Sequence, residues 1–129
     1  SYIKWSEKEI EFDVDMMDVE YLGNENLICH VWDNLLSNAI KFSPCGGTIY
    51  IRMMPEGEKI RFSIENEGPQ ISEYSMKHIF DKFYQGDSSH KQEGNGLGLA
   101  LVKQILNLCM GTVSVENIPG SGCRFTVIL

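Results

Sequence analysis

The sequence predicts an α+β fold, a two-layer α/β sandwich in which a mixed, mostly antiparallel sheet carries about three helices on one face. Two observations favour this fold class. Segments rich in β-branched and aromatic residues come in pairs separated by turn residues, and amphipathic segments of helical period lie between them. Single strands and helices do not alternate regularly along the chain, which excludes a doubly wound parallel sheet.

The first half of the chain is predicted to contain a strand, a long helix and a hairpin. Residues 10–14 (IEFDV) alternate between apolar and charged side chains, as half-buried strands do. A helical pattern begins at Asn24 or the residue after it and ends at Phe42, before a Ser-Pro-Cys-Gly-Gly sequence that stops it. Residues 48–54 and 59–65 flank the turn sequence Pro-Glu-Gly-Glu, so we expect them to pair as a hairpin.

The second half is predicted to contain two helices and a second hairpin, joined by polar loops. The elements are a loop over residues 66–71, a short helix over 74–79 capped by Ser72, a loop over 85–96, a helix over 97–110 and strands over 112–115 and 123–129. The apolar side chains expected in the core are Leu27, Val31, Leu35, Ile40, Ile49, Ile51, Phe62, Ile64, Leu101, Ile105, Val113, Phe125 and Val127.

Length, charge and cysteine content limit the classes of protein to consider. We expect residues 1–129 to be one domain, excised from a longer protein, with residues 1–9 as a lead-in. The net charge of −7 argues against nonspecific binding of nucleic acid and against a basic membrane-surface module. The four cysteines are too scattered for a zinc or redox motif, so we expect free thiols.

A polar stripe interrupts the long predicted helix. His30, Asn34, Asn38 and Lys41 are spaced so that they share one face of it. Asparagine is a poor residue for a helix interior, and a solvated helix face usually carries more charge. The stripe is therefore either a plain polar surface or a face where amide oxygens hold a hard cation such as Mg²⁺ and Lys41 meets a phosphate.

Three further segments stand out. Glycines at 94, 96 and 98 open the second long helix, where unpaired backbone N–H groups and the helix dipole favour an anion. The alternative is a flexible loop that needs glycine only to turn. Residues 66–71 (NEGPQI) follow a strand and read as a turn, and residues 79–84 (IFDKFY) read as an aromatic cluster that seals the end of the sheet.

Taken in this order, the four segments resemble the ATP-binding catalytic domain of sensor histidine kinases, which belongs to the Bergerat-fold ATPase superfamily. The resembling segments are residues 32–42 for the N box, 66–71 for the G1 box, 79–84 for the F box, 94–99 for the G2 box and 120–125 for the last Gly-rich strand entry. The resemblance extends over about residues 14–129. It implies a Bergerat fold and an activity that uses ATP and Mg²⁺.

The resemblance also implies roles for single residues. Asn38 would be the Mg²⁺ ligand, with Asn34 beside it as a second polar contact or catalytic helper, and Lys82 would act near the γ-phosphate. Residues 85–95 would form a lid over the nucleotide. The residues implied in ATP binding are Asn34, Asn38, Lys41, Phe42, Asn66, Gly68, Ile71, Phe83, Gly94, Gly96, Leu97, Gly98, Leu99 and Cys123.

Three positions depart from the family pattern. Asn66 stands where an Asp usually meets the adenine 6-amino group, Gln70 replaces a glycine, and Cys123 replaces a Thr or Ser. An amide has both an acceptor and donors, whereas a carboxylate only accepts. Two consequences are open: Asn66 weakens ATP binding because its hydrogen bond loses charge assistance, or it relaxes base choice by donating to a guanine 6-oxo group.

The implied function is donation of the ATP γ-phosphoryl group to a histidine on a separate helical dimerisation domain, which no segment of this sequence matches. Without that domain we expect no autophosphorylation. The resemblance further implies a downstream response regulator, a monomeric fragment, and a cytoplasmic location within a membrane-bound bacterial sensor. The alternative is a degenerate module of the same fold that binds nucleotide weakly or not at all and docks a partner.

Overall fold

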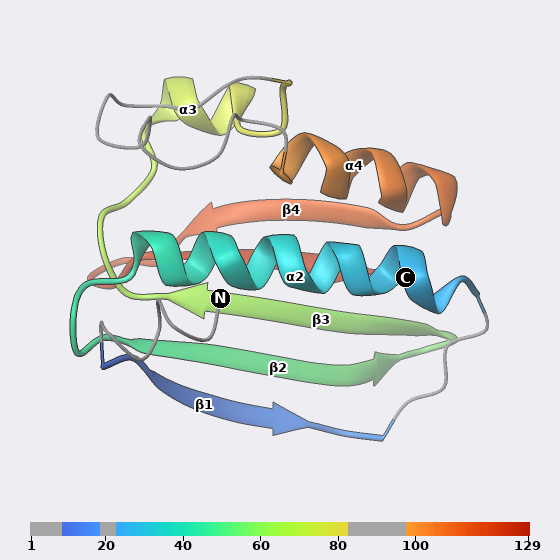
Figure 1. The fold of residues 1–129 in the computed structure, drawn as a ribbon, viewed down its shortest axis with the longest axis horizontal. Coiled ribbons are helices and arrows are strands. Elements are labelled where there is room, and N and C mark those ends of the chain that lie inside the picture. The colour runs from blue at the N-terminus through green and yellow to red at the C-terminus, as the bar shows by residue number, and fades with distance from the viewer. Residues whose placement is uncertain (1–8, 19–22, 83–97) are drawn as a thin grey trace.

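The computed structural model describes residues 9–18, 23–82 and 98–129, which form a five-stranded sheet and three helices (Figure 1). In their order across the sheet, the strands are β1 (Glu11–Met16), β2 (Thr48–Glu56), β3 (Lys59–Asn66), β5 (Cys123–Ile128) and β4 (Thr112–Asn117). β1 runs parallel to β2, and the other neighbouring pairs are antiparallel. The predicted mixed, mostly antiparallel sheet is therefore confirmed.

The described helices are α2 (Glu25–Phe42), α3 (Glu73–His78) and α4 (Gly98–Leu108). Figure 1 shows α2 and α4 lying across the same face of the sheet, with α3 beyond α4 at the end furthest from β1. This arrangement is the predicted two-layer α/β sandwich. The predicted loop over residues 85–96 lies outside the described residues.

Helix α2 begins and ends where its sequence predicts. At its start, the backbone N–H of Leu27 donates to Oδ1 of Asn24 at 3.1 Å, which satisfies one of the unpaired donors of the first turn. At its end, Ser43 leaves the helical conformation, and its backbone N–H and its hydroxyl both donate to the Ala39 carbonyl, at 3.0 and 2.7 Å. These caps fix the length of the helix that carries the polar stripe.

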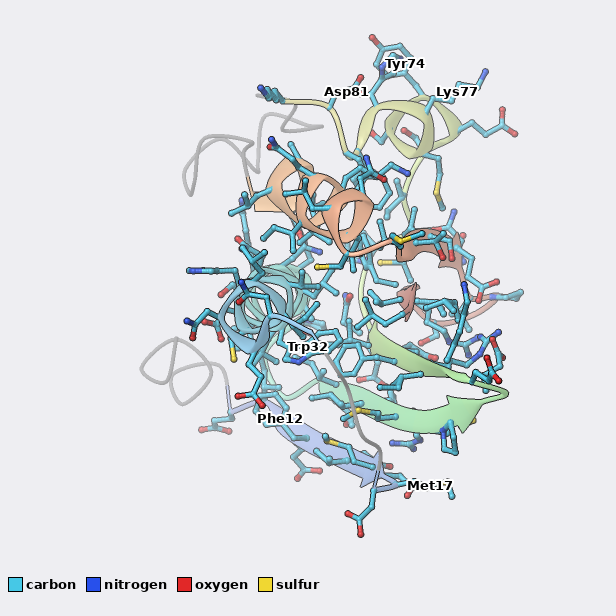
Figure 2. The ribbon with its side chains drawn as sticks, turned by 90° about the vertical axis from the view of Figure 1, so that its right-hand side faces the viewer. Phe12, Met17, Trp32, Tyr74, Lys77 and Asp81 are labelled. Atoms are coloured by element: carbon cyan, nitrogen blue, oxygen red, sulfur yellow. The ribbon has the colours of Figure 1, made fainter. Side chains whose placement is uncertain are left out.

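The hydrophobic core lies between the sheet and the pair α2 and α4. Its fully buried side chains come from both helices and from the sheet: Val31, Leu35 and Ile40 on α2; Val102 and Leu106 on α4; Ile49, Ile64, Phe125 and Val127 on the strands. Trp32 stacks on Phe62 with ring centroids 4.2 Å apart, and Figure 2 shows it on the sheet side of α2. Most of the predicted core is confirmed, with Leu27 and Ile51 partly buried at its margin.

One core prediction was wrong. Leu101 is 40% exposed, whereas Val102 and Leu106 are fully buried. Lys103, Gln104 and Asn107 mark the outer side of α4, but leucines occur on several sides of the helix, so the sequence leaves the edge of its inner face open. At about 100° per residue, positions 102, 105 and 106 share one face, and Leu101 and Leu108 lie together at the edge of that face, about 100° from its centre. The side that packs on α2 and β4 decides the assignment.

The two faces of the sheet differ in chemistry. On β3, the even-numbered residues from Ile60 to Asn66 are buried under the helices, and the intervening odd-numbered ones are half-exposed on the other face. Side chains there, including all three arginines of the chain, are mainly polar. None of the helices in the described residues is long and apolar enough to span a lipid bilayer.

Candidate functional site

In the polar stripe of α2, Asn34, Asn38 and Lys41 are half-buried and His30 is exposed. Nδ2 of Asn34 donates to the carbonyl of His30 at 2.7 Å, so its Oδ1 remains as the outward acceptor. That oxygen lies against the start of α4, because a Cβ built on Gly98 would stand only 2.9 Å from it. The amide of Asn38, one turn further on, makes no hydrogen bond with any other described residue. The structure therefore brings Asn34 and Gly98, two of the predicted site residues, together.

The end of the stripe carries the predicted phosphate-binding lysine. Nζ of Lys41 lies 5.2 Å from the ring centroid of Phe42, close enough for a cation–π contact. Both side chains are half-buried at the last turn of α2. Lys41, Asn38 and Asn34 therefore present one cation and two amide groups along the same side of the helix.

The loop over residues 66–71 is held by hydrogen bonds from three directions. The backbone N–H of Thr48, at the start of β2, donates to Oε1 of Glu67 at 2.9 Å. Asn117, at the end of β4, makes two hydrogen bonds with the backbone of Ile71. Its Oδ1 accepts from the Ile71 N–H and its Nδ2 donates to the Ile71 carbonyl, both at 2.8 Å. Nε2 of Gln70 donates to the Ile118 carbonyl at 2.9 Å. The loop is thus a fixed part of the sheet end.

Asn66 begins this loop and is 1% exposed. Its Nδ2 donates to the carbonyl of Glu67 at 2.9 Å, and its Oδ1 accepts from the Cys123 thiol at 3.6 Å. A carbonyl oxygen can only accept, so it fixes which end of the amide is the nitrogen. The orientation leaves Oδ1 as an acceptor on the side of Cys123.

The Cys123 thiol is neutral at physiological pH. Burial, and secondarily the charge of Glu65, raise the pKa of this thiol to about 11. Asn66 and Cys123 therefore form an uncharged pair where the family pattern has an Asp with a Thr or Ser. A buried carboxylate would need compensation that an amide does not.

Two glycines allow the chain segments around Asn66 to meet. Gly68 has a φ of +131°, and a Cβ on it would stand 2.6 Å from the carbonyl oxygen of Phe42 at the end of α2. A Cβ on Gly122 would overlap the carbonyl of Asn66. At these glycines the backbone of the 66–71 loop therefore contacts the backbone at the end of α2 and the backbone just before β5 directly, with no side chain between them.

The segment predicted as an aromatic cluster is anchored by a single ring. α3 has no buried residue, but Phe80 just after it packs edge-on against Phe125 in the core, with centroids 6.1 Å apart. Nδ1 of His78 lies 2.8 Å from Oδ2 of Asp81. Figure 2 shows Tyr74, Lys77 and Asp81 at the outer tip of the molecule. The Phe80 contact supports the prediction that this cluster closes one end of the sheet.

The structure describes only some of the other predicted site residues. Lys82 is exposed, and Leu99 and Ile71 are partly buried against the core. Phe83, Gly94, Gly96 and Leu97 lie outside the described residues. Within the described ranges no group of three His, Cys, Asp or Glu side chains could hold a metal ion.

Sequence reasoning missed two anchoring residues, Glu67 and Asn117. Their side chains position the backbone of the 66–71 loop rather than face a ligand. For Asn117, the sequence signal was its place at the end of a strand, shortly before a Pro-Gly turn. Its partner 46 residues away could not be deduced from the sequence pattern.

Comparison with known proteins bears directly on this arrangement. Residues 23–129 match the sequence family described as histidine kinase-, DNA gyrase B- and HSP90-like ATPases. The chain belongs to this family. The predicted family resemblance and fold are therefore confirmed.

Solved structures narrow the likeness to histidine kinases. The mycobacterial sensor histidine kinase MprB is 26% identical and superposes with a TM-score of 0.88 over 99% of this chain and 88% of that one. The catalytic domain of the histidine kinase ThkA is 28% identical, with a TM-score of 0.82 over 99% and 84% of the two chains. Full-length ShkA, solved in complex with AMPPNP, is 26% identical, with a TM-score of 0.81 over 98% of this chain and 26% of ShkA.

Curated relatives are much longer proteins. The heme sensor protein HssS of Staphylococcus saprophyticus is 34% identical over 122 residues, which are 95% of this chain and 26% of HssS. The circadian input-output histidine kinase CikA of Synechococcus elongatus is 42% identical over 96 residues, which are 73% of this chain and 13% of CikA. The chain thus spans about a quarter of HssS and about an eighth of CikA.

Proposed function

We propose that this domain binds ATP where α2, the 66–71 loop and the start of α4 converge, and that it donates the γ-phosphoryl group to a histidine. That histidine would lie on a helical phosphoacceptor domain elsewhere in a longer sensor kinase. The observation that carries the proposal is the fixed, buried Asn66, whose acceptor oxygen lies at the meeting point of these segments in a member of the ATPase family.

The adenine base would be read by Asn66. Oδ1 of the amide accepts hydrogen bonds on the side of Cys123, and an adenine 6-amino group is a donor. A guanine would place its 6-oxo acceptor against this oxygen. We therefore favour ATP over GTP, and we favour weakened ATP binding over relaxed base choice as the consequence of having Asn in place of Asp.

The phosphates would lie between the start of α4 and the stripe of α2. Backbone N–H groups at a helix N-terminus attract anions, and Gly98 lets the chain approach closely there. Lys41 would contribute positive charge from the end of α2, and exposed Lys82 would do so near the γ-phosphate. These residues would position the nucleotide, which is most of what phosphoryl transfer asks of a protein.

Mg²⁺ fits the donors of this face. Hard divalent cations prefer oxygen ligands, and the amide oxygen of half-buried Asn38 has no hydrogen bond to another described residue. Asn38 would hold the ion, and Asn34 would be its polar neighbour. When bound, Mg²⁺ neutralises phosphate charge. In the transfer, the bond from the γ-phosphorus to the β–γ bridging oxygen breaks, ADP leaves, and a phosphorus–nitrogen bond forms on the acceptor imidazole.

The remaining partners follow from this function. A phosphohistidine would pass its phosphoryl group to a response regulator. The domain would work in the cytoplasm, where ATP is available, as part of a membrane-bound sensor. We predict that this domain alone is a monomer.

Calorimetry tests the binding step. ATP titrated with Mg²⁺ into the domain is expected to bind, and GTP is expected to bind about tenfold more weakly or worse, because its 6-oxo acceptor would face Oδ1 of Asn66, which can only accept. Asn38→Ala should lower the affinity for ATP with Mg²⁺ by about tenfold or more. Asn107→Ala, the same change at an exposed site on α4, is the matched control and should leave the affinity within about twofold.

The outcome that would contradict the proposal is a folded domain that binds neither nucleotide. That result would favour the degenerate docking module. Equal affinities for ATP and GTP would instead contradict the assigned orientation of Asn66.

A further inference from the structure

All three arginines of this acidic chain lie on the face of the sheet opposite the helices. Arg52 is on β2, Arg61 on β3 and Arg124 on β5, and their side chains line one hollow of about 300 Å³. Arginines are only three of 129 residues, and the chain carries a net charge of −7. Their convergence from three strands onto one hollow therefore marks a local site of unusual chemistry.

The strand register explains the hollow. Ser63 is paired with Arg52 on one side and with Thr126 on the other. The short side chains of Ser63 and Thr126 therefore leave a depression in the surface of the sheet beside Arg52. The neighbouring rows carry longer side chains, with Glu65 and Arg124 in one and Arg61 in the other. Of these, Ser63, Glu65 and the three arginines line the hollow.

Two guanidinium groups keep donors free for a ligand. Arg61 donates to Glu56 only through Nε, at 2.7 Å, and Arg52 donates only through Nη1, chiefly to the carbonyl of Asp13 at 2.8 Å. Both Nη atoms of Arg61, and Nε and Nη2 of Arg52, have no acceptor among the described residues. Arg124 is different: all three of its nitrogens are held by Glu65 and Glu116.

Tyr50 and Met54 form the apolar part of the lining of the hollow. The guanidinium of Arg52 lies 5.8 Å from the ring centroid of Tyr50, and both residues line the hollow with Met54. An aromatic ring and a thioether beside free guanidinium donors suit a molecule with one anionic and one apolar part.

We propose that this hollow is a binding site for a small phosphate monoester, separate from the nucleotide site on the other side of the sheet. Carboxylates of the protein already pair with each arginine, so an incoming monoanionic carboxylate gains little by competing with them. A phosphate monoester carries about −1.5 to −2 charges and three acceptor oxygens, enough to engage Arg52 and Arg61 together. The proposal does not depend on ATP binding by the domain.

The side-chain Nε–Hε resonances of arginine give a direct test by NMR. The chain yields three such signals, and none belongs to a residue of the proposed nucleotide site. Phenyl phosphate, at constant ionic strength, should shift the Arg52 and Arg61 signals saturably. Inorganic phosphate should shift the same two signals more weakly, because it lacks the part that contacts Tyr50 and Met54. Benzoate should need about tenfold higher concentration than phenyl phosphate.

Variants locate the site. Arg61→Gln, at a half-exposed position, should weaken phenyl phosphate binding about tenfold, as loss of a charged hydrogen bond does. Ser63→Leu should fill the hollow with a larger side chain and abolish phenyl phosphate binding without removing a charge. Lys103→Gln removes one positive charge from the exposed side of α4 and should change the affinity by less than about twofold.

Three results would overturn the proposal. Arginine signals that move only as much as sodium chloride moves them would mean that the hollow holds no anion. Benzoate binding as tightly as phenyl phosphate would mean that the site does not select phosphate. Retained binding in both Arg61→Gln and Ser63→Leu would place the ligand elsewhere.

Discussion

At the scale of single residues, the buried contact of Asn66 with Cys123 sets the character of the candidate nucleotide site. The Asn66 amide is held in one orientation by the Glu67 carbonyl, and the Cys123 thiol donates to its oxygen. The sequence identified both positions as departures from the family pattern. It could not tell which way the amide points, because that depends on a backbone carbonyl whose direction is set only by the folded loop.

The raised pKa of Cys123 gives a prediction for stability. Burial holds the thiol protonated until about pH 11 in the folded domain, whereas an exposed thiol loses its proton near pH 8.5. The buried neutral thiol therefore makes its full contribution to the free energy of unfolding below about pH 8.5, and this contribution is lost as the pH rises through 11. Measured by urea denaturation, the free energy of unfolding of the wild type should fall by up to about 2–3 kcal/mol more than that of Cys123→Ala across this pH range.

Comparison with the variant removes the effect of other groups that titrate at high pH, because tyrosines and lysines are common to both proteins. Parallel curves of unfolding free energy against pH for the two proteins would contradict the burial of a neutral thiol at this site.

At the scale of secondary-structure elements, boundaries were more predictable than faces. Asn24 and the Ser-Pro-Cys-Gly-Gly sequence predicted both ends of α2, because caps and breakers act through local hydrogen bonds. The orientation of α4 was not predictable in the same way. Leu101 was placed in the core although it is 40% exposed, because it lies at the edge of the apolar face of α4, where the sequence pattern does not show which side chains α2 and the sheet cover.

The corrected face of α4 predicts unequal effects for two leucines. Leu106→Ala should lower the free energy of unfolding by about 3 kcal/mol, because it leaves a cavity at a fully buried position. Leu101→Ala should cost less than about 1 kcal/mol at its exposed site. Urea denaturation of both variants measures the difference, and equal losses would mean that the inner face has been assigned incorrectly.

At the scale of the whole molecule, the sheet separates two sets of functional groups. The helix side brings the polar stripe of α2, the 66–71 loop and the start of α4 together, and the opposite side gathers the three arginines. Motif order predicted the first set through resemblance to a family. The second set could not be predicted, because Arg52, Arg61 and Arg124 meet only through the pairing register of three strands.

The proposed function depends on nucleotide binding on the helix side of the sheet, at the 66–71 loop. Amide hydrogen exchange, measured with and without ATP and Mg²⁺, shows where the nucleotide binds. We predict that exchange slows by about tenfold or more within residues 66–71 and 117–123, which the hydrogen bonds of Asn117 and Cys123 tie together, and stays unchanged in residues 50–54. Protection confined to residues 50–54, or no change anywhere under saturating ATP, would contradict the account.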